Sequence, residues 1–126
     1  MTDSRSFSVN TTEGFTDYIT AQSVDIQPAL RKVYAIFKTI FPDAPECLSF
    51  GHPSFGNLVG FEACASNIAI YVGRDILSDL DKAGKLRKYR QNGSVVTSRD
   101  AIFFKREIGA EQLVMVSEIA AFVRGT

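Results

Sequence analysis

Hydrophobic side chains recur at steps of three and four along residues 28–41. This spacing gathers them on one face of an α-helix and leaves the basic side chains of the segment on the other face. Pro28 suits the first turn, where its missing N–H costs nothing, and Pro42 stops the run. A shorter pattern of the same kind predicts a helix at residues 15–21.

The pattern changes after Pro42, where prolines and glycines interrupt the chain and short β-rich runs replace the helical spacing. Strands are predicted at residues 47–50, 58–64 and 68–72. The last two runs are separated by Ala65-Ser66-Asn67, a connection typical of an antiparallel hairpin.

The remaining sequence predicts a helix at residues 75–86, a strand at 101–104 and a closing helix at 111–123, with a turn at Gln91-Asn92-Gly93-Ser94. Because helices bracket the strands instead of alternating with them, the pattern favours an α+β fold. In it, a mostly antiparallel sheet has helices packed on one face. Residues 1–12 are predicted to form a flexible N-terminal tail, and residues 13–126 a single domain.

Composition narrows the function classes. The chain has 126 residues, of which 45% are hydrophobic and 22% charged, and its formal net charge is zero. This is ordinary globular composition, and the neutrality argues against bulk attraction to nucleic acid or to a membrane surface. A basic run at residues 82–90 could contact nucleic acid, but a solvated helix end is the better interpretation.

We find no apolar leader at the start of the sequence. We also find no run of apolar residues near the roughly 18 that a membrane span needs, so we expect a cytoplasmic protein. The sequence contains no phosphate-binding loop, dinucleotide fingerprint, hydrolase elbow or zinc-protease motif. Cys47, His52 and Cys64 match no zinc spacing, and the two cysteines are better interpreted as small buried hydrophobes. No catalytic pair can be placed, so we expect a protein that is not an enzyme.

One segment carries a family resemblance. Residues 46–55, Glu-Cys-Leu-Ser-Phe-Gly-His-Pro-Ser-Phe, form a strand that ends in an aromatic–glycine pair, followed by a proline, a small residue and a second aromatic. Phe61-Glu62-Ala63, Ile68-Ala69-Ile70-Tyr71 and Thr97-Ser98-Arg99 follow in order. In this arrangement the sequence resembles the YdhG-like family, a small bacterial domain of unknown function.

The resemblance implies an α+β fold related to frataxin-type intracellular iron chaperones, a cytoplasmic location and a non-enzymatic role in iron handling or iron–sulfur assembly. The implied cargo is weakly bound iron, and the implied partners are iron–sulfur assembly proteins. Oxygen ligands would come from Asp17, Asp25, Asp43 and Glu46. On density alone, these acids are better interpreted as scattered solubilising charge.

A second hypothesis is a small binding module that uses the loop from Phe50 to Phe55. Phe50, His52, Phe55 and Tyr71 would form its walls, and Arg99 would hold an anion such as a carboxylate. The alternative is that this loop is purely conformational, with a glycine that permits the turn, a proline that stiffens it and phenylalanines that fill the core. The sequence leaves the oligomeric state open.

Overall fold

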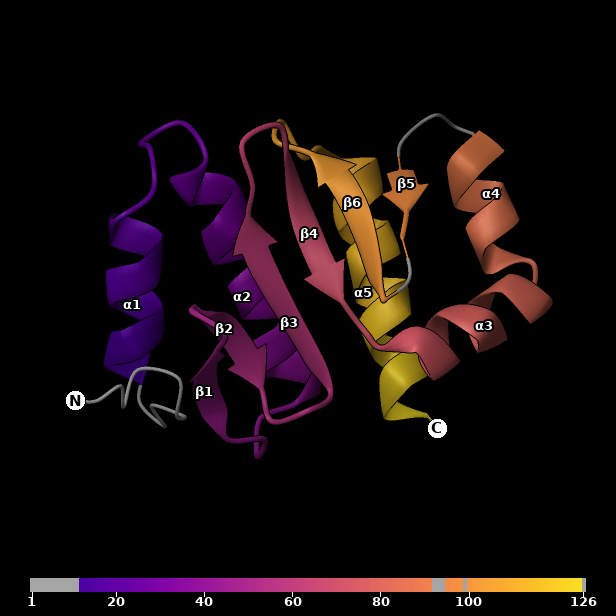
Figure 1. Cartoon of the computed structure of the whole chain (residues 1–126), viewed down its shortest axis with the longest axis horizontal. Coiled ribbons are helices and arrows are strands. Elements are labelled where there is room, and N and C mark those ends of the chain that lie inside the picture. The colour runs from indigo at the N-terminus through magenta and orange to yellow at the C-terminus, as the bar shows by residue number, and fades with distance from the viewer. Residues whose placement is uncertain (1–11, 92–94, 99, 126) are drawn as a thin grey trace.

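The computed structural model describes residues 12–91, 95–98 and 100–125 (Figure 1). Six strands form one sheet in the order β1-β2-β3-β4-β6-β5, and every neighbouring pair is antiparallel. The strands are β1 (Glu46–Ser49), β2 (His52–Phe55), β3 (Val59–Ala63), β4 (Asn67–Tyr71), β5 (Val95–Thr97) and β6 (Ala101–Lys105). The sheet is therefore a meander through β4, which β5 and β6 extend at one edge.

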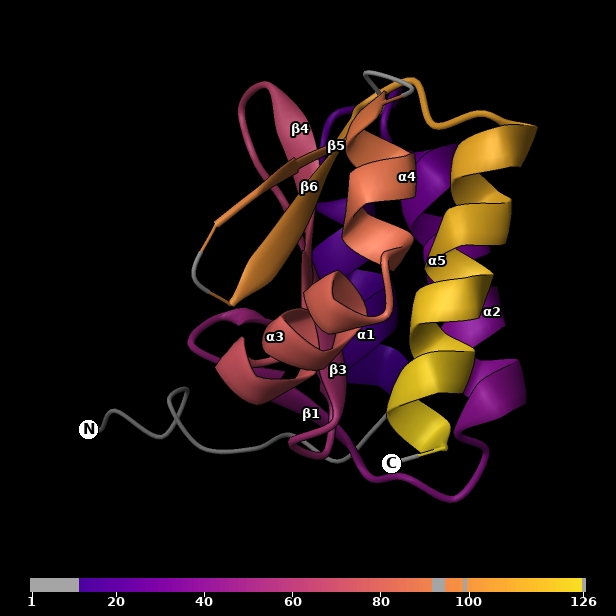
Figure 2. The same ribbon diagram turned by 90° about the vertical axis from the view of Figure 1, so that its right-hand side faces the viewer.

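The described helices leave one face of this sheet uncovered. They are α1 (Thr12–Thr20), α2 (Gln27–Ile40), α3 (Arg74–Lys82), α4 (Lys85–Gln91) and α5 (Ala110–Arg124). Figure 2 shows α2 and α5 side by side to the right of the sheet, and Figure 1 shows α3 and α4 at the end of the sheet where β5 lies. The predicted α+β class, an antiparallel sheet with helices on one face, is confirmed.

The predicted helix at residues 28–41 is confirmed as α2, which has a proline in its first turn. Leu30, Val33 and Phe37, which the helical spacing selects, are buried in it together with Ala29. The prediction of one helix at residues 75–86 is wrong, because the chain breaks into α3 and α4. Gly84 lies at the break with φ +79°, a left-handed conformation that glycine adopts without strain.

The interpretation of residues 50–56 as a loop is also wrong, because His52–Phe55 form β2. The β1–β2 connection has only two residues, Phe50 and Gly51, and both have positive φ (52° and 84°), as in a type I′ hairpin turn. Pro53 is tolerated in this strand because pairing with β3 begins one residue later, at Ser54.

The alternation of side chains gives the sheet two unlike faces. The helix-covered face, which we call the covered face, carries the large buried residues, with Phe55, Phe61, Ile68, Ile70, Ile102 and Phe104 fully buried. Aromatic rings meet there edge to face, as in the Phe15–Phe55 and Phe37–Phe55 pairs with centroids 5.4 and 5.8 Å apart.

The opposite face, which we call the open face, carries smaller and more polar residues, including Ser54, Gly60, Glu62, Ala69 and Tyr71.

No helix in the described ranges has the length and apolar character of a membrane span. The predicted N-terminal tail lies outside the described residues except for Thr12, which begins α1. Residues 92–94 of the predicted turn at 91–94 also lie outside them.

Candidate functional site

A hollow of about 460 Å³ opens on the open face between the β1–β2 turn and the end of β4. Its walls come from five parts of the chain: the β1–β2 hairpin, the β2–β3 connection, β3, the end of β4 with the β4–α3 connection, and the residue before β6. The side chains that define its chemistry are Phe50, His52, Glu62, Tyr71 and Asp100. We call this hollow the open-face cavity.

One wall of the cavity is a stacked pair of rings. The imidazole of His52 lies 4.7 Å from the ring of Tyr71, centroid to centroid, with 24° between the planes. His52 is on β2 and Tyr71 on β4, so the two strands are separated by β3. The residue of β3 between them is Gly60, which pairs with Tyr71. A Cβ at Gly60 would lie 3.6 Å from two atoms of the imidazole ring. This is an ordinary van der Waals distance, so the imidazole lies directly beside Gly60.

A short hydrogen bond fixes Tyr71 on its other side. The Tyr71 hydroxyl donates to the carboxylate of Glu62 at 2.6 Å, the length of a charge-assisted bond. Burial raises the pKa of Tyr71 well above its ordinary value, and the Glu62 hydrogen bond adds to the rise. Tyr71 therefore stays protonated at neutral pH and serves as a hydrogen-bond donor, not as a base.

His52 is uncharged at neutral pH. Burial lowers the pKa of its imidazole below the usual 6.5, and the nearby Glu62 carboxylate offsets this only in part. The ring thus offers a neutral, flat surface to the cavity. Because His52 is the only histidine of the chain, its titration can be followed without assignment.

Phe50 stands at the rim of the cavity and is 91% exposed. Its φ of 52° is left-handed, a conformation that costs an ordinary residue about 1–2 kcal/mol. Asparagine or glycine would suit the position better. An exposed aromatic ring on strained backbone beside a hollow is a feature that stability does not explain.

The residues predicted for a ligand site fall into three groups. Phe50, His52 and Tyr71 line the cavity. Phe55 does not, because its side chain is fully buried on the covered face between α1, α2 and the sheet. Arg99 lies outside the described residues. The purely conformational interpretation fits Phe55, which fills the core, but not Phe50.

The four acids predicted as iron ligands occupy separate surroundings. Asp17 is exposed on α1, and Asp43 is exposed after α2. Asp25 follows α1, with its carboxylate 3.6 Å from the Arg106 guanidinium. A hydrogen bond from Ser23 and the charge of Arg106 lower the pKa of Asp25.

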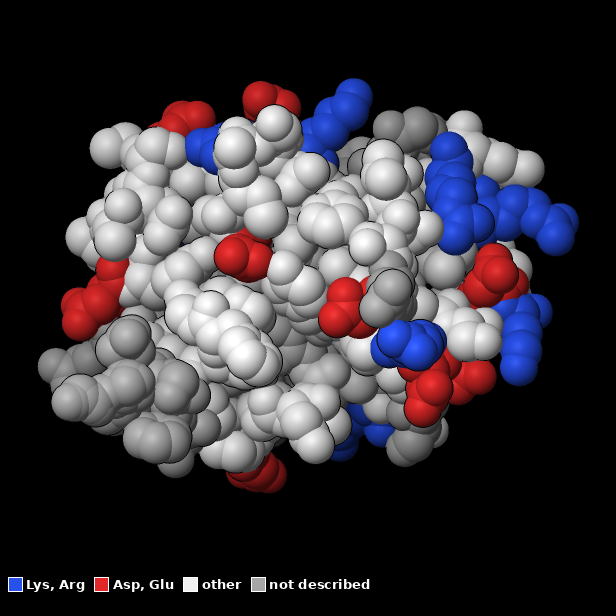
Figure 3. Space-filling model, viewed as in Figure 1, with Lys and Arg blue, Asp and Glu red and all other residues white. Residues whose placement is uncertain are grey.

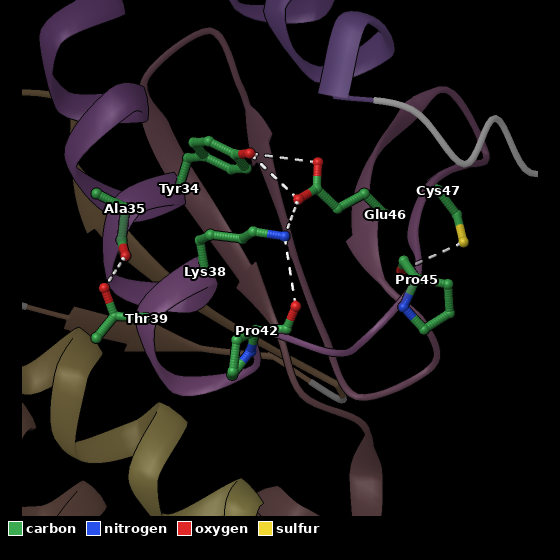
Figure 4. A network of polar contacts seen from close by, with 8 residues as sticks. All are labelled: Tyr34, Ala35, Lys38, Thr39, Pro42, Pro45, Glu46 and Cys47. Carbon is green, nitrogen blue, oxygen red and sulfur yellow. Dashed lines mark hydrogen bonds and ion pairs between the residues drawn. The ribbon is translucent and has the colours of Figure 1, made fainter.

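Glu46 is buried on the covered face, 6% exposed, and is held by α2 (Figure 4). The Lys38 ammonium lies 2.9 Å from its carboxylate, and the Tyr34 hydroxyl donates to both oxygens at 3.2 and 3.3 Å. Hydrogen bonding to Glu46 raises the pKa of Lys38. Neutralised in this way, Glu46 joins β1 to α2 and is poorly placed to bind a cation.

Among the described residues, no group of three or more His, Cys, Asp or Glu side chains could hold a metal ion. Cys47 is buried and Cys64 half-buried, and neither forms a disulfide. Their predicted role as small hydrophobic side chains agrees with the burial of Cys47.

Among the lining residues that sequence reasoning missed, three matter most for the chemistry of the cavity: Gly60, Glu62 and Asp100. The alternation along β3 carried a signal for the first two. Val59, Phe61 and Ala63 share the covered face, so a glycine and an acid between them had to lie on the other face. Asp100 carried no such signal. It reaches the cavity because its carbonyl accepts the N–H groups of Val72 and Gly73, which brings the start of β6 against the end of β4.

The fold and cavity together define a small α+β domain with one bare sheet face. The structure is similar to the crystal structure of YdhG, a protein of the DUF1801 family from Bacillus subtilis. The TM-score is 0.68, the sequence identity is 11% and 89% of each chain is covered. At this identity the likeness shows a shared, YdhG-like fold. No family model matches the sequence, and no curated protein matches it.

Proposed function

We propose that this protein is a non-enzymatic binding module that takes a small organic molecule into the open-face cavity. The observation that carries the proposal is the His52–Tyr71 stack at the wall of a hollow large enough for such a ligand. Binding sites of this kind join apolar walls to a few convergent polar groups. Phe50 and the ring pair supply the walls here, and Glu62 supplies a fixed polar group.

The same geometry argues against catalysis. Tyr71 is a protonated donor already committed to Glu62, and His52 presents its ring face to Tyr71. An activated nucleophile needs a base within hydrogen-bond reach, and no such pair is found among the described cavity residues. Recognition without reaction is the simpler role for this set of groups.

Titration with indole, a neutral planar probe, tests the proposal. We expect amide shifts at Gly60, Glu62, Tyr71 and Gly73 in a ¹⁵N–¹H spectrum, with a dissociation constant on the order of 1 mM, as suits so small a ligand. His52→Ala should weaken binding several-fold, since an aromatic pair contributes about 0.5–1.5 kcal/mol. Val96→Ala is the matched control, because Val96 is exposed and does not line the cavity.

Two results would refute the proposal. One is the absence of any shift around the cavity at several times the expected dissociation constant. The other is equal binding by wild type and His52→Ala when both are folded by the same spectrum.

Iron handling remains the prediction that the YdhG-like resemblance suggested, and it has less support than the cavity. Glu46 is occupied by Lys38 and Tyr34, and Asp25 faces Arg106. Anaerobic calorimetry with Fe(II) tests it directly. Given these surroundings we expect no heat above that of buffer at up to about hundred-micromolar iron, whereas saturable heat that Asp17→Asn and Asp43→Asn abolish would revive the iron prediction.

A further inference from the structure

The described charged residues that line the open-face cavity have one sign. Glu62 and Asp100 line it, and no lysine or arginine is found among its described lining residues. Figure 3 shows this face as largely neutral over the middle of the sheet, with two acidic side chains within it; most basic side chains lie toward the edges of the view, and one lies beside the right-hand acidic side chain. The charged groups of the described lining are therefore both negative, which favours a ligand that carries a positive charge.

The orientation of Glu62 suits a hydrogen-bond donor. A carboxylate has two oxygens with about four acceptor positions in all. The Tyr71 hydroxyl uses one of them through its 2.6 Å bond to Oε1. That bond fixes the direction of the carboxylate and leaves it the capacity to accept from a donor in the cavity. Such preorganisation lowers the entropy lost when a ligand binds.

A positive influence acts on the same cavity but is weaker. Gly73 lines the cavity and is the N-cap of α3, whose dipole is equivalent to roughly half a positive charge. Asp75 in the first turn of α3 opposes that dipole. Within the described lining, two carboxylates thus face half a charge that is itself offset, and Arg74, the first residue of α3, lies next to the lining but is not part of it.

The apolar walls set the rest of the ligand. Phe50 at the rim and the His52–Tyr71 pair present aromatic surfaces that suit a planar or apolar body. Aromatic faces also attract a cation placed over them, as in sites that recognise organic ammonium groups.

We propose, on the basis of the binding function above, that the open-face cavity selects organic cations. The ammonium or guanidinium group lies against Glu62 and Asp100, and the planar body of the ligand lies against Phe50 and the His52–Tyr71 pair. This choice opposes the anion predicted from the sequence through Arg99, so one experiment decides between them.

The experiment compares three probes that share one ring system: tryptamine, a cation; indole, which is neutral; and indole-3-acetate, an anion. At neutral pH and low salt, we expect tryptamine to bind about tenfold more tightly than indole and indole-3-acetate to bind more weakly than indole. The preference should shrink as salt is added, because exposed charges are screened.

Glu62→Gln should reduce the ratio of tryptamine to indole-3-acetate affinity several-fold. Glu107→Gln is the matched control: it removes the same charge from an exposed residue that does not line the cavity. Should Glu62→Gln fail to fold after losing its bond to Tyr71, Asp100→Asn provides the second variant, and its ratio should fall as well.

The outcomes separate the two proposals. If none of the probes binds, the binding function and the cation preference both fail. If all three bind equally, or if Glu107→Gln lowers the ratio as much as Glu62→Gln does, the cavity binds ligands but the cation preference is wrong. Tightest binding of indole-3-acetate, lost in Arg99→Ala, would overturn the preference in favour of the anion.

Discussion

The two faces of the sheet differ in side-chain size and burial, although neighbouring residues of the same strands form both. On the covered face, Phe55, Phe61 and Phe104 are fully buried, and the aromatic rings around Phe55 meet edge to face. On the open face, the positions between them hold glycine, alanine, serine and the ring pair His52–Tyr71. Large side chains fill space on one face, whereas small ones leave a hollow on the other.

This difference indicates that the covered face determines the stability of the protein and that the open face determines what it binds. A buried phenylalanine contributes through the surface it removes from water and the voids it prevents. A glycine beside two stacked rings contributes by the room it leaves. Substitutions that shorten side chains on the covered face should therefore change the free energy of unfolding, and those that shorten side chains around the cavity should change mainly what the protein binds.

The largest effect is expected from a pair of adjacent phenylalanines in β6 that point to opposite faces. Phe104 is fully buried on the covered face, and Phe103 is half-buried on the open one. Phe104→Ala should lower the free energy of unfolding by about 3–5 kcal/mol, because it leaves a cavity in the core. Phe103→Ala should cost about 1 kcal/mol, in proportion to its smaller burial. Urea denaturation measures both, and equal losses would contradict the division of the faces.

The second effect concerns Gly60. A Cβ there would lie 3.0 Å from the Pro53 carbonyl oxygen, a backbone atom that would have to shift, and at an ordinary contact distance of 3.6 Å from the His52 ring. Gly60→Ala should cost about 1–3 kcal/mol and push His52 away from Tyr71. Because burial lowers the pKa of His52, displacement should raise its pKa toward 6.5.

Proton NMR of this single histidine measures the change directly. The lowered pKa also fixes the sign of a pH effect: the unfolded chain binds the proton more readily, so His52 contributes stability that is lost as pH falls below about 6.5. An unchanged His52 pKa in Gly60→Ala would mean that the glycine does not set the ring stack.

Sequence reasoning found what depends on periodicity. It predicted α2 within one residue at each end, the hairpin of β3 and β4, and the class of the fold. It failed where a single residue determines the local backbone. At Gly84 a left-handed turn splits a helical pattern into two helices. Pro53 suggested a loop, although it lies in a strand.

The site was predicted only in part, because some of its residues stand out in the sequence and others come together only in the folded sheet. Phe50 and His52 stood out as an aromatic and a lone histidine in a glycine–proline segment. Glu62 and Asp100 did not stand out, since their relation to His52 and Tyr71 exists only after β2, β3, β4 and β6 align. Glu46 was misleading: as one of several acids it suggested a metal ligand, while burial beside Lys38 gives it a structural role.

A smaller effect on stability is expected at Glu46, a buried charge on the covered face, which is otherwise mostly apolar. Tyr34→Phe removes a hydroxyl that donates to Glu46 at 3.2 and 3.3 Å. The loss should be about 1.5 kcal/mol, at the low end for a bond to a charged group, because Lys38 still compensates the carboxylate. Urea denaturation of Tyr34→Phe measures it. A neutral result would mean that Lys38 alone satisfies Glu46.

The smallest expected effect is a gain in stability, and it is coupled to a loss of binding. Phe50→Asn places a residue that tolerates left-handed backbone in the β1–β2 turn, so the protein should gain about 0.5–1 kcal/mol of stability. The same change removes an aromatic wall of the cavity, so tryptamine and indole should both bind more weakly. Urea denaturation and probe titration of one sample measure the two quantities, with Val96→Ala, another exposed apolar residue, as the control. Greater stability together with weaker binding is expected only if strained Phe50 serves recognition. Loss of stability in Phe50→Asn would instead show that this exposed ring supports the hairpin.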